Sequence, residues 1–432
     1  MQAFIIAGGK GTRLREITGE DIPKPMVKMC GVPLLERCIR NLKHYGITEI
    51  FMSVGYLAQK IVDYFGSGEN FGVHIEYIVE DEPLGSAGAL FYVKGRIEND
   101  FVMISGDLLF DVDLDKMISY HKKNDAIATL FTHPNCHPYD SDIVITDKNN
   151  RVIRFDYKGG ERNYYYSNNV NAGLFVINKK ALDYITSLSK INMEKDFLSS
   201  LILREERVFA YKSPEYIRDM GTPERFNQGE NDLKNNLVQK RSLKNKQKAI
   251  FLDRDGTINR YKGFIRDVKD IELLPGVADA IELINKSEYL AIAVSNQPVI
   301  ARGEASFEDV DNMFCKIETL LGEEGAYLYG IYYCPHHPHS GYEGEVKALK
   351  IDCDCRKPKI GLLKQAEKNF NLDLSQCYII GDSNLDIQTG LNAGIKTIRV
   401  KTGVSEEKQI PADFEGINLI DCVKFIKNKE EI

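Results

Sequence analysis

Residues 249–257, Ala-Ile-Phe-Leu-Asp-Arg-Asp-Gly-Thr, join a short apolar run to two carboxylates, Asp253 and Asp255. An apolar run of this length before a glycine predicts a buried strand of a parallel sheet. Carboxylates at i and i+2 after a strand can face one phosphate in different roles, one attacking phosphorus and one handling the leaving-group proton. A plain turn or a calcium loop is the alternative, but the further acidic ligands of a calcium loop are missing.

Polar side chains follow three later apolar segments of the same half. Ser295-Asn296-Gln297 supplies a hydroxyl and amides, Arg356-Lys357-Pro358 supplies cations, and residues 381–386 supply carboxylates for Mg²⁺. The four motifs, in this order, resemble those of the haloacid-dehalogenase phosphatase superfamily over about residues 248–432.

That resemblance implies a role for each residue. Asp253 would be the nucleophile that forms an aspartyl phosphate, and Asp255 would protonate the leaving oxygen and then activate water. Asp386 would assist, or would only be the N-terminal residue of a helix. The phosphate- and sugar-binding residues would be Ser295, Asn296, Arg356 and Lys357, and the Mg²⁺ ligands would be Asp253, Asp255 (through its backbone) and Asp382.

Cysteine and histidine cluster between these motifs as Cys334-Pro-His336 and Cys353-Asp-Cys355. Thiolates and an imidazole at paired spacing predict a closed, structural Zn²⁺ site, and His337 or His339 could take the place of His336. This loop before Arg-Lys-Pro resembles two phosphatase branches, heptose-1,7-bisphosphate 7-phosphatase and histidinol phosphatase. Pro298-Val299 stands where both branches usually have Ser-Gly, which leaves the fine substrate specificity open.

Strand-like and helix-like patterns alternate in both halves, which predicts an α/β fold with two Rossmann-like domains, a nucleotidyltransferase fold and then a haloacid-dehalogenase-like fold. The predicted division is a first domain over 1–232, a basic linker over 233–247 and a second domain over 248–432. The linker is rich in lysine, and a solvated connector or terminal helix is the favoured interpretation over a nucleic-acid or membrane contact. Strands are expected over 3–7, 50–54, 75–79, 101–105, 249–252, 290–295, 378–380 and 397–400, and helices over 34–45, 58–65, 277–285 and 361–369.

The first predicted strand ends in Gly8-Gly9-Lys10-Gly11-Thr12-Arg13, where glycines let backbone N–H groups approach phosphate oxygens. Lys24 stands between two prolines, and Leu84-Gly85-Ser86-Ala87-Gly88 is a second turn where a flat base can lie. Asp107 follows a strand, and Asp219 precedes a glycine turn. Each aspartate alone is more often a turn or cap residue, but two of them can hold Mg²⁺ against a triphosphate.

Together these motifs resemble the sugar-nucleotide pyrophosphorylase family over about residues 1–230. The resemblance implies that Arg13 and Lys24 stabilise the phosphates in the transition state and that Asp107 and Asp219 carry Mg²⁺. The residues implied to bind the nucleotide are Gly8, Gly9, Gly11, Thr12, Arg13, Lys24, Gly85, Ser86, Gly88 and Asp107.

The segment Asn171-Ala172-Gly173 matches the sugar-contacting segment of that family. The family usually has Glu-Lys before this segment, and here Asp156-Tyr157-Lys158 stands in its place, so the resemblance implies Lys158 as the phosphate ligand in a changed motif. His133, Cys136 and His137 are interpreted as a loop rather than as a metal site. The run from His137 to Asp142 resembles the heptose-phosphate guanylyltransferase branch of the family.

The two resemblances together predict a bifunctional enzyme of nucleotide-activated heptose synthesis that uses heptose 1,7-bisphosphate, heptose 1-phosphate and GTP or another NTP, with Mg²⁺ in both domains and Zn²⁺ in the second. One alternative is a mannose- or glucose-1-phosphate nucleotidyltransferase joined to a histidinol-phosphatase-like domain. The other is that one half is a degenerate regulatory module.

The composition has 43% hydrophobic and 28% charged residues and a net charge of −7. These values are typical of a globular protein of the cytoplasm and argue against a broad nucleic-acid surface.

No apolar stretch approaches the roughly 20 residues needed to span a bilayer, so no membrane partner is expected. The nine cysteines include an odd one and are mostly scattered, which is no disulfide framework. An oligomer is possible.

Overall fold

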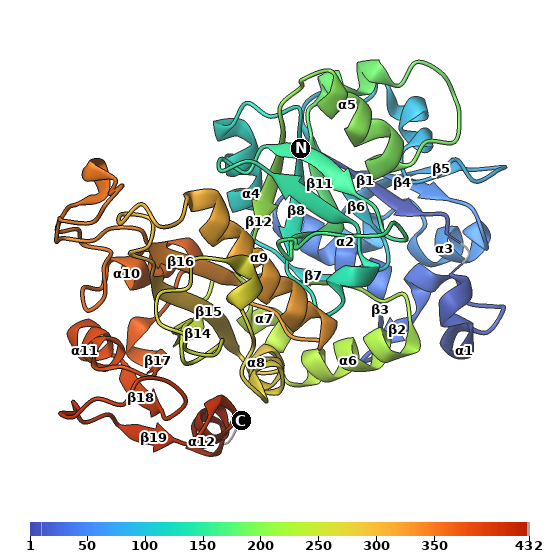
Figure 1. The fold of residues 1–432 in the computed structure, drawn as a ribbon. Helices are drawn as coiled ribbons and strands as arrows, with labels where there is room; N and C mark the ends of the chain where they lie inside the picture. Colours follow the sequence, from blue (N-terminus) through green and yellow to red (C-terminus); the bar gives the residue numbers. More distant parts are fainter. Residues whose placement is uncertain (10, 430–432) are drawn as a thin grey trace. The chain divides into compact units, whose positions relative to one another are not determined.

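The computed structural model describes residues 1–9 and 11–429 and divides the chain into two compact units. The first unit comprises Met1–His133, Asp142–Tyr157 and Asn171–Ser242, and the second comprises Pro134–Ser141, Lys158–Val170 and Leu243–Ile432. Each unit is built on its own sheet, with helices beside it (Figure 1). The two-domain α/β architecture predicted from the sequence is confirmed.

The sheet of the first unit has nine strands, with the order β10-β9-β11-β6-β1-β4-β5 along its main path and β8 paired to β11 and β12. β1, β4, β5 and β6 run parallel, so their carboxyl ends meet at one edge of the sheet. β7, which follows β6 closely in the chain, forms a separate short antiparallel pair with β13. The bounds are β1 Gln2–Ala7, β4 Glu49–Val54, β5 His74–Val79, β6 Phe101–Ser105, β7 Leu108–Asp111, β8 Ala128–His133, β9 Ile143–Thr146, β10 Val152–Asp156, β11 Val170–Ile177, β12 Val208–Lys212 and β13 Tyr216–Asp219, with a small hairpin of β2 Lys28–Met29 and β3 Val32–Pro33.

Alternation along β1 explains why this sheet is covered on both faces. Ala3, Ile5 and Ala7 join one buried cluster, and Phe4 joins another on the opposite face. The helix α2, Leu34–His44, covers the first face with Leu35, Cys38, Ile39 and Leu42, which have the helical i, i+3, i+4, i+7 spacing. The other helices are α1 Arg15–Thr18, α3 Ala58–Phe65, α4 Leu114–Lys123, α5 Ser199–Leu203, α6 Pro223–Lys234 and α7 Leu237–Lys240.

The sheet of the second unit has six strands in the order β16-β15-β14-β17-β18-β19, and every pair in it is parallel. The segment quoted first in the sequence forms β14 at the centre of this sheet. A central strand buried on both faces is apolar throughout, as residues 249–252 are. The bounds are β14 Lys248–Leu252, β15 Tyr289–Asn296, β16 Gly330–Cys334, β17 Tyr378–Gly381, β18 Lys396–Val400 and β19 Phe414–Gly416.

Helices lie on both faces of this second sheet. Ile250 and Leu252 pack in one cluster with side chains of α8, α9 and α12, whereas Ala249 and Phe251 pack in another with α10. Within the same unit, the backbone N–H of Tyr166 donates to the Thr319 hydroxyl of α9 at 3.0 Å. The bounds are α8 Val277–Asn285, α9 Phe307–Glu323, α10 Gly361–Phe370, α11 Asn384–Ala393 and α12 Leu419–Lys429.

The basic stretch between the two motif sets is partly helical. It contains the end of α6 and the four-residue helix α7, and β14 begins directly after it; Val238 of α7 is buried among apolar side chains of the first unit. The predicted division into 1–232, 233–247 and 248–432 remains a prediction.

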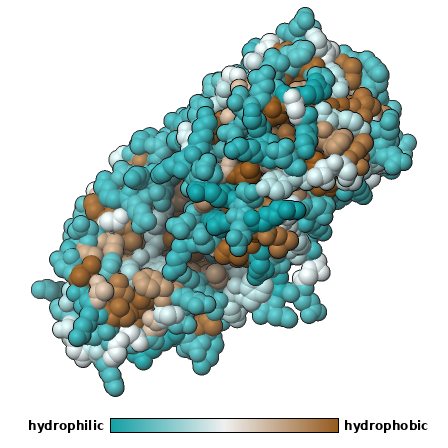
Figure 2. Space-filling view, turned by 90° about the horizontal axis from the view of Figure 1, so that it is seen from above, coloured by the Kyte–Doolittle hydropathy of each residue, from teal (hydrophilic) through white to brown (hydrophobic). Residues whose placement is uncertain are grey.

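Polar side chains cover most of the face shown in Figure 2, and hydrophobic side chains appear there in scattered patches. Among the described residues, no helix is both long enough and apolar enough to cross a bilayer.

Candidate active sites and metal centre

One ammonium joins the two predicted carboxylates of the first unit. Lys24 Nζ lies 2.7 Å from Asp219 Oδ1 and also contacts Asp107 Oδ2. Burial alone would lower the pKa of Lys24, but the two carboxylates outweigh burial and raise it. Asp107 follows β6 and Asp219 ends β13, and the pairing of β13 with β7 brings the two together. Both carboxylates thus contact one cation, the Lys24 ammonium. A Mg²⁺ ion bound by Asp107 and Asp219 would need the same convergence of their oxygen atoms.

The glycine turn after β1 lies beside this ion cluster. Gly11 has a φ of +58°, and a Cβ on it would lie 2.7 Å from the Cβ of Lys24, so only glycine allows Lys24 to take its place. Thr12 and Arg13 continue the turn and are exposed. Lys10, which belongs to the same predicted turn, lies outside the described residues.

The second predicted turn, Leu84–Gly88, packs closely against residues 189–193. A Cβ on Gly85 would lie 2.5 Å from the carbonyl oxygen of Ile191, and Gly85 has a φ of +76°. The hydroxyl of Ser86 accepts a hydrogen bond from the backbone N–H of Met193 at 2.7 Å. The glycines therefore fix the turn against a neighbouring segment, and their contact with a base remains a prediction.

Two functional candidates of the first unit were missed by sequence reasoning. Arg225 Nη1 lies 3.0 Å from Asp219 Oδ2, and Glu194 Oε1 accepts from the predicted sugar ligand Asn171 at 2.7 Å. Neither follows a strand or lies in a glycine turn, so no local pattern marks them. Gly173 lies against Ser105 and Leu108, beside Asp107. Lys158 belongs to a segment of the second unit, and its phosphate contact remains a prediction.

Three buried carboxylates and one lysine form the centre of the second unit. Oxygen atoms of Asp253, Asp382 and Asp386 all lie within 4.8 Å of one another. Lys357 Nζ lies 2.6 Å from Asp253 Oδ1 and 2.5 Å from Asp386 Oδ1. Burial raises the pKa of Asp253 to about 8 against the opposing effect of Lys357, and burial together with Asp386 raises the pKa of Asp382 to about 6. This uncompensated negative charge suits a divalent cation.

Asp386 caps a helix and also contacts Lys357, and its assistance to the reaction remains a prediction. Its Oδ2 accepts from the backbone N–H and the hydroxyl of Ser383, which closes a capping box at the start of α11. Its Oδ1 contacts Lys357. The two oxygens of one carboxylate thus cap a helix and hold the lysine that lies beside Asp253.

Asp255 lies apart from the three-carboxylate group. Its carboxylate accepts two hydrogen bonds at 3.0 Å from the guanidinium of Arg254, which is 1% exposed. The amide of Gln297 donates to Asp255 Oδ2 at 3.3 Å and to Ser295 Oγ at 2.8 Å. This network places the predicted acid–base residue and the predicted phosphate-binding hydroxyl side by side. The Mg²⁺ contact expected through the Asp255 backbone remains a prediction.

Asn296 and Arg356, predicted to contact the phosphate or the sugar, also orient parts of the site. The Asn296 side chain accepts from the backbone N–H of Lys357 and donates to its carbonyl oxygen, each at 3.0 Å. Arg356 Nη1 donates to the carbonyl oxygen of His336 at 3.1 Å. Asn296 thereby fixes the backbone of Lys357, and the Cys/His loop fixes the side chain of Arg356.

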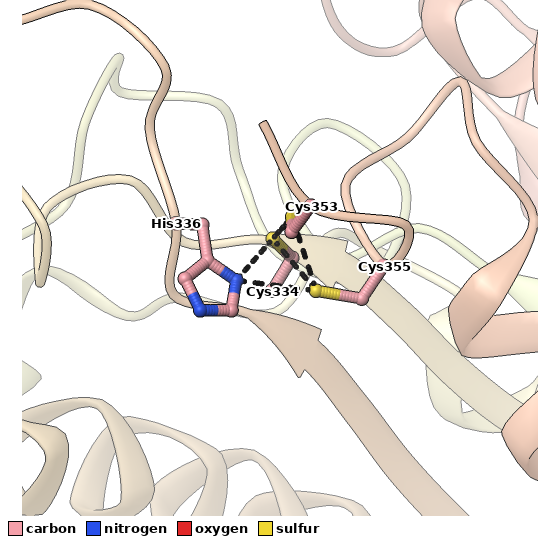
Figure 3. Close-up of side chains that lie close together, drawn as sticks. All are labelled: Cys334, His336, Cys353 and Cys355. Atoms are coloured by element: carbon pink, nitrogen blue, oxygen red, sulfur yellow. Dashed lines mark hydrogen bonds between the residues drawn. The ribbon is translucent and has the colours of Figure 1, made fainter. Parts of the chain in front are cut away.

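Four predicted metal ligands converge at the end of β16. The Sγ atoms of Cys334, Cys353 and Cys355 lie 3.2–3.5 Å apart, and His336 Nδ1 lies 3.3 Å from Cys355 Sγ (Figure 3). Their donor atoms form a compact set that can hold a metal ion. His336 is the histidine that the structure brings to this set, whereas His337 Nδ1 contacts the carbonyl oxygen of His339.

The loop of His133, Cys136 and His137 gathers no metal-binding group within the described part of the chain. His137 Nδ1 instead lies 3.1 Å from the Ser141 hydroxyl, as expected of a hydrogen-bonded loop.

Residues 2–236 match the model of the nucleotidyl transferase family, and residues 354–421 match a HAD-hydrolase-like model. With the geometry of the two sites, these matches define the chain as a nucleotidyl transferase in its first half and a haloacid-dehalogenase-like phosphatase in its second. The chain belongs to both families.

For each half, one curated relative is matched over nearly its whole length. The D-glycero-beta-D-manno-heptose-1,7-bisphosphate 7-phosphatase of Haemophilus ducreyi is 38% identical over 184 residues, which is 42% of this chain and 98% of the relative. The D-glycero-alpha-D-manno-heptose 1-phosphate guanylyltransferase of Aneurinibacillus thermoaerophilus is 34% identical over 234 residues, 54% of this chain and 98% of the relative. A mannose-1-phosphate guanylyltransferase of Mycobacterium tuberculosis is 31% identical over 246 residues, 56% of this chain and 67% of the relative.

Proposed function

We propose that this chain catalyses two consecutive steps of nucleotide-activated heptose synthesis. The second unit removes the 7-phosphate of a heptose 1,7-bisphosphate, and the first transfers GMP from GTP to the resulting heptose 1-phosphate. The observation that carries the proposal is that the two halves of one chain resemble two enzymes that act in sequence. Removal of the 7-phosphate from a heptose 1,7-bisphosphate gives a heptose 1-phosphate, which is the substrate in the name of the guanylyltransferase relative. Dependence on GTP is consistent with a cytoplasmic enzyme.

The phosphatase step proceeds by nucleophilic displacement. Asp253 attacks phosphorus and the bond to O7 of the sugar breaks, while Asp255 gives a proton to the departing oxygen. Water then attacks the aspartyl phosphate, Asp255 accepts its proton, and inorganic phosphate leaves. Ser295 and Lys357 hold the phosphoryl oxygens, and Lys357 is already placed 2.6 Å from the nucleophile.

In the transferase step, a phosphate oxygen of the heptose 1-phosphate attacks the α-phosphorus of GTP, and pyrophosphate leaves. Arg13 and Lys24 stabilise the charge on the phosphate oxygens. Binding of the triphosphate draws Lys24 from the carboxylates to the phosphates.

Each site has residues that fit a metal. Asp107 and Asp219 would hold Mg²⁺ in the first unit, and Asp253 and Asp382 would hold it in the second; bound Mg²⁺ neutralises phosphate charge and orients the reacting groups. The Cys/His set suits Zn²⁺, because its sulfurs lie 3.2–3.5 Å apart, close to the roughly 3.8 Å that separates the sulfurs of a tetrahedral ion with Zn–S bonds of about 2.3 Å.

The two steps leave the anomeric centre untouched, since neither breaks the bond between C1 and its oxygen. Both units must therefore accept the same anomer. The phosphatase relative is named for the beta anomer and the guanylyltransferase relative for the alpha anomer. One of the two units of this chain therefore differs from its relative in anomer preference.

The test incubates the purified full chain with the alpha or the beta bisphosphate and each NTP, and follows phosphate, pyrophosphate and the nucleotide sugar. We expect one anomer to yield GDP-heptose with GTP. Mannose 1-phosphate is the second candidate substrate because of the mannose-1-phosphate guanylyltransferase relative. Its use in preference to both heptose 1-phosphates would overturn the assignment, and equal use of UTP would overturn the guanylyl specificity.

A further inference from the structure

Glu194 is a half-buried carboxylate held in place by its neighbours in the first unit. It lies in the short π-helix Met193–Leu198, and the side chain of Asn192 caps the N-terminus of this helix. That side chain accepts from the backbone N–H of Glu194 at 3.0 Å. Glu194 Oε1 in turn accepts from Asn171 Nδ2 at 2.7 Å. The carboxylate is therefore positioned both through its backbone and through its side chain.

Two independent contacts place Glu194 at the transferase site. On one side, the adjacent Met193 donates its N–H to the hydroxyl of Ser86 in the Leu84–Gly88 turn. On the other side, Asn171 lies on β11 close to Gly173, and Gly173 lies against Ser105 of the paired strand β6. Ser105 donates to Asp107 at 2.7 Å. Glu194 is thus linked through Met193 to the expected nucleotide turn and through Asn171 to the strand that lies beside Ser105 and Asp107.

The chemistry of this position suits a neutral, hydroxyl-rich ligand. An ionised carboxylate only accepts hydrogen bonds, so it complements hydroxyl donors and repels phosphate. Burial raises the pKa of Glu194, and the charge of Asp142 adds to the effect. A poorly solvated carboxylate gains most from donors that a ligand supplies. The cations Lys24 and Arg225 both contact Asp219. We therefore expect phosphate groups to bind near Asp219 and sugar hydroxyl groups to bind near Glu194.

We propose that Glu194 is a specificity-determining residue of the transferase, whose carboxylate accepts hydrogen bonds from hydroxyl groups of the sugar phosphate. The inference rests on the proposed transferase function and adds to it the residue that recognises the sugar. Asn171 acts through Glu194 as a positioning residue.

The test compares Glu194→Gln and Glu194→Ala with the unmodified full chain in pyrophosphate-release assays. We expect the KM for the heptose 1-phosphate to rise about tenfold in Glu194→Gln and more in Glu194→Ala, with the KM for GTP within about twofold. Asp196→Asn is the matched control, because Asp196 accepts from Asn192 in the same turn. Its KM for the sugar should stay within about twofold.

A panel of sugar 1-phosphates that each lack one hydroxyl separates recognition from mere support of the fold. The unmodified chain should discriminate against at least one member, and Glu194→Ala should lose that discrimination. An unchanged KM for the sugar phosphate in folded Glu194→Ala would overturn the inference. Equal losses of activity with every sugar of the panel, in Glu194→Ala and in Asp196→Asn alike, would also overturn it. Activity of the unmodified chain on heptose 1-phosphate tests the proposed function separately.

Discussion

Lys357 Nζ lies 2.6 Å from Asp253 Oδ1, and both groups are almost fully removed from solvent. Burial and the neighbouring carboxylates raise the pKa of Asp253 and the pKa of Asp382, and the Lys357 ammonium opposes both rises. We therefore expect the lysine to have two tasks, to favour ionisation of the nucleophile and to bind the phosphoryl group.

Replacing this lysine should abolish the phosphatase reaction. We expect Lys357→Met to lower kcat/KM for phosphate release at least about a hundredfold, because the transition-state charge loses its buried partner. The unpaired carboxylates should also destabilise the second unit by about 3–5 kcal/mol. Phosphate release and calorimetric unfolding measure the two effects. Full phosphatase activity in Lys357→Met would exclude Lys357 from the site.

The close approach of backbone to Asp382 gives a second prediction. A Cβ on Gly403 would lie 1.9 Å from Asp382 Oδ2, and the next residue, Val404, donates its N–H to that oxygen at 2.7 Å. Gly403→Ala should therefore displace Asp382 and lower the phosphatase rate about a hundredfold. The variant should keep its transferase rate, which serves as the control for folding. An unaffected phosphatase would show that Asp382 tolerates displacement.

The Cys/His set should hold one zinc ion that stabilises the fold of the second unit. We expect Cys353→Ser to lower the zinc content and to reduce the melting temperature of that unit by at least about 5 °C. Cys136→Ser is the control, since Cys136 is exposed and lies outside the set. Elemental analysis and calorimetry give both readouts. Zinc-free protein with an unchanged melting temperature would remove this assignment.

The two reactions should be separable by single substitutions, because the two sets of charged groups lie on different sheets. Asp107→Asn should stop pyrophosphate release while phosphate release from the bisphosphate continues. Asp253→Asn should do the reverse when heptose 1-phosphate is supplied. A folded variant in which one substitution silences both reactions would contradict the assignment of two sites.

Much of both sites could be predicted because their residues follow strands. Apolar runs placed β6 and β14, so the aspartates after them, Asp107 and Asp253, were assigned to the carboxyl edges of two sheets. Paired spacing likewise identified the three cysteines of the metal set. These signals are local in the sequence, and the fold preserves them.

The remaining features depend on contacts between distant segments. Glu194 accepts a hydrogen bond from Asn171, and the adjacent Met193 donates one to Ser86. No sequence pattern around Glu194 predicts either contact. The choice of His336 over His337 depends on how the backbone leaves β16. The sequence predicts that Asp386 either caps a helix or assists the reaction, and only the folded chain shows that the carboxylate that caps α11 also contacts Lys357.

The order of the two steps is the most direct test of the account. A transferase pocket shaped for a neutral sugar tail would leave a 7-phosphate desolvated and unpaired, which costs at least about 2–3 kcal/mol. The measurement is GDP-heptose formation by Asp253→Asn from GTP and the heptose 1,7-bisphosphate. We predict that the bisphosphate remains unconsumed and that added heptose 1-phosphate restores product. Nucleotide transfer to the bisphosphate at a rate comparable to that with the 1-phosphate would contradict it.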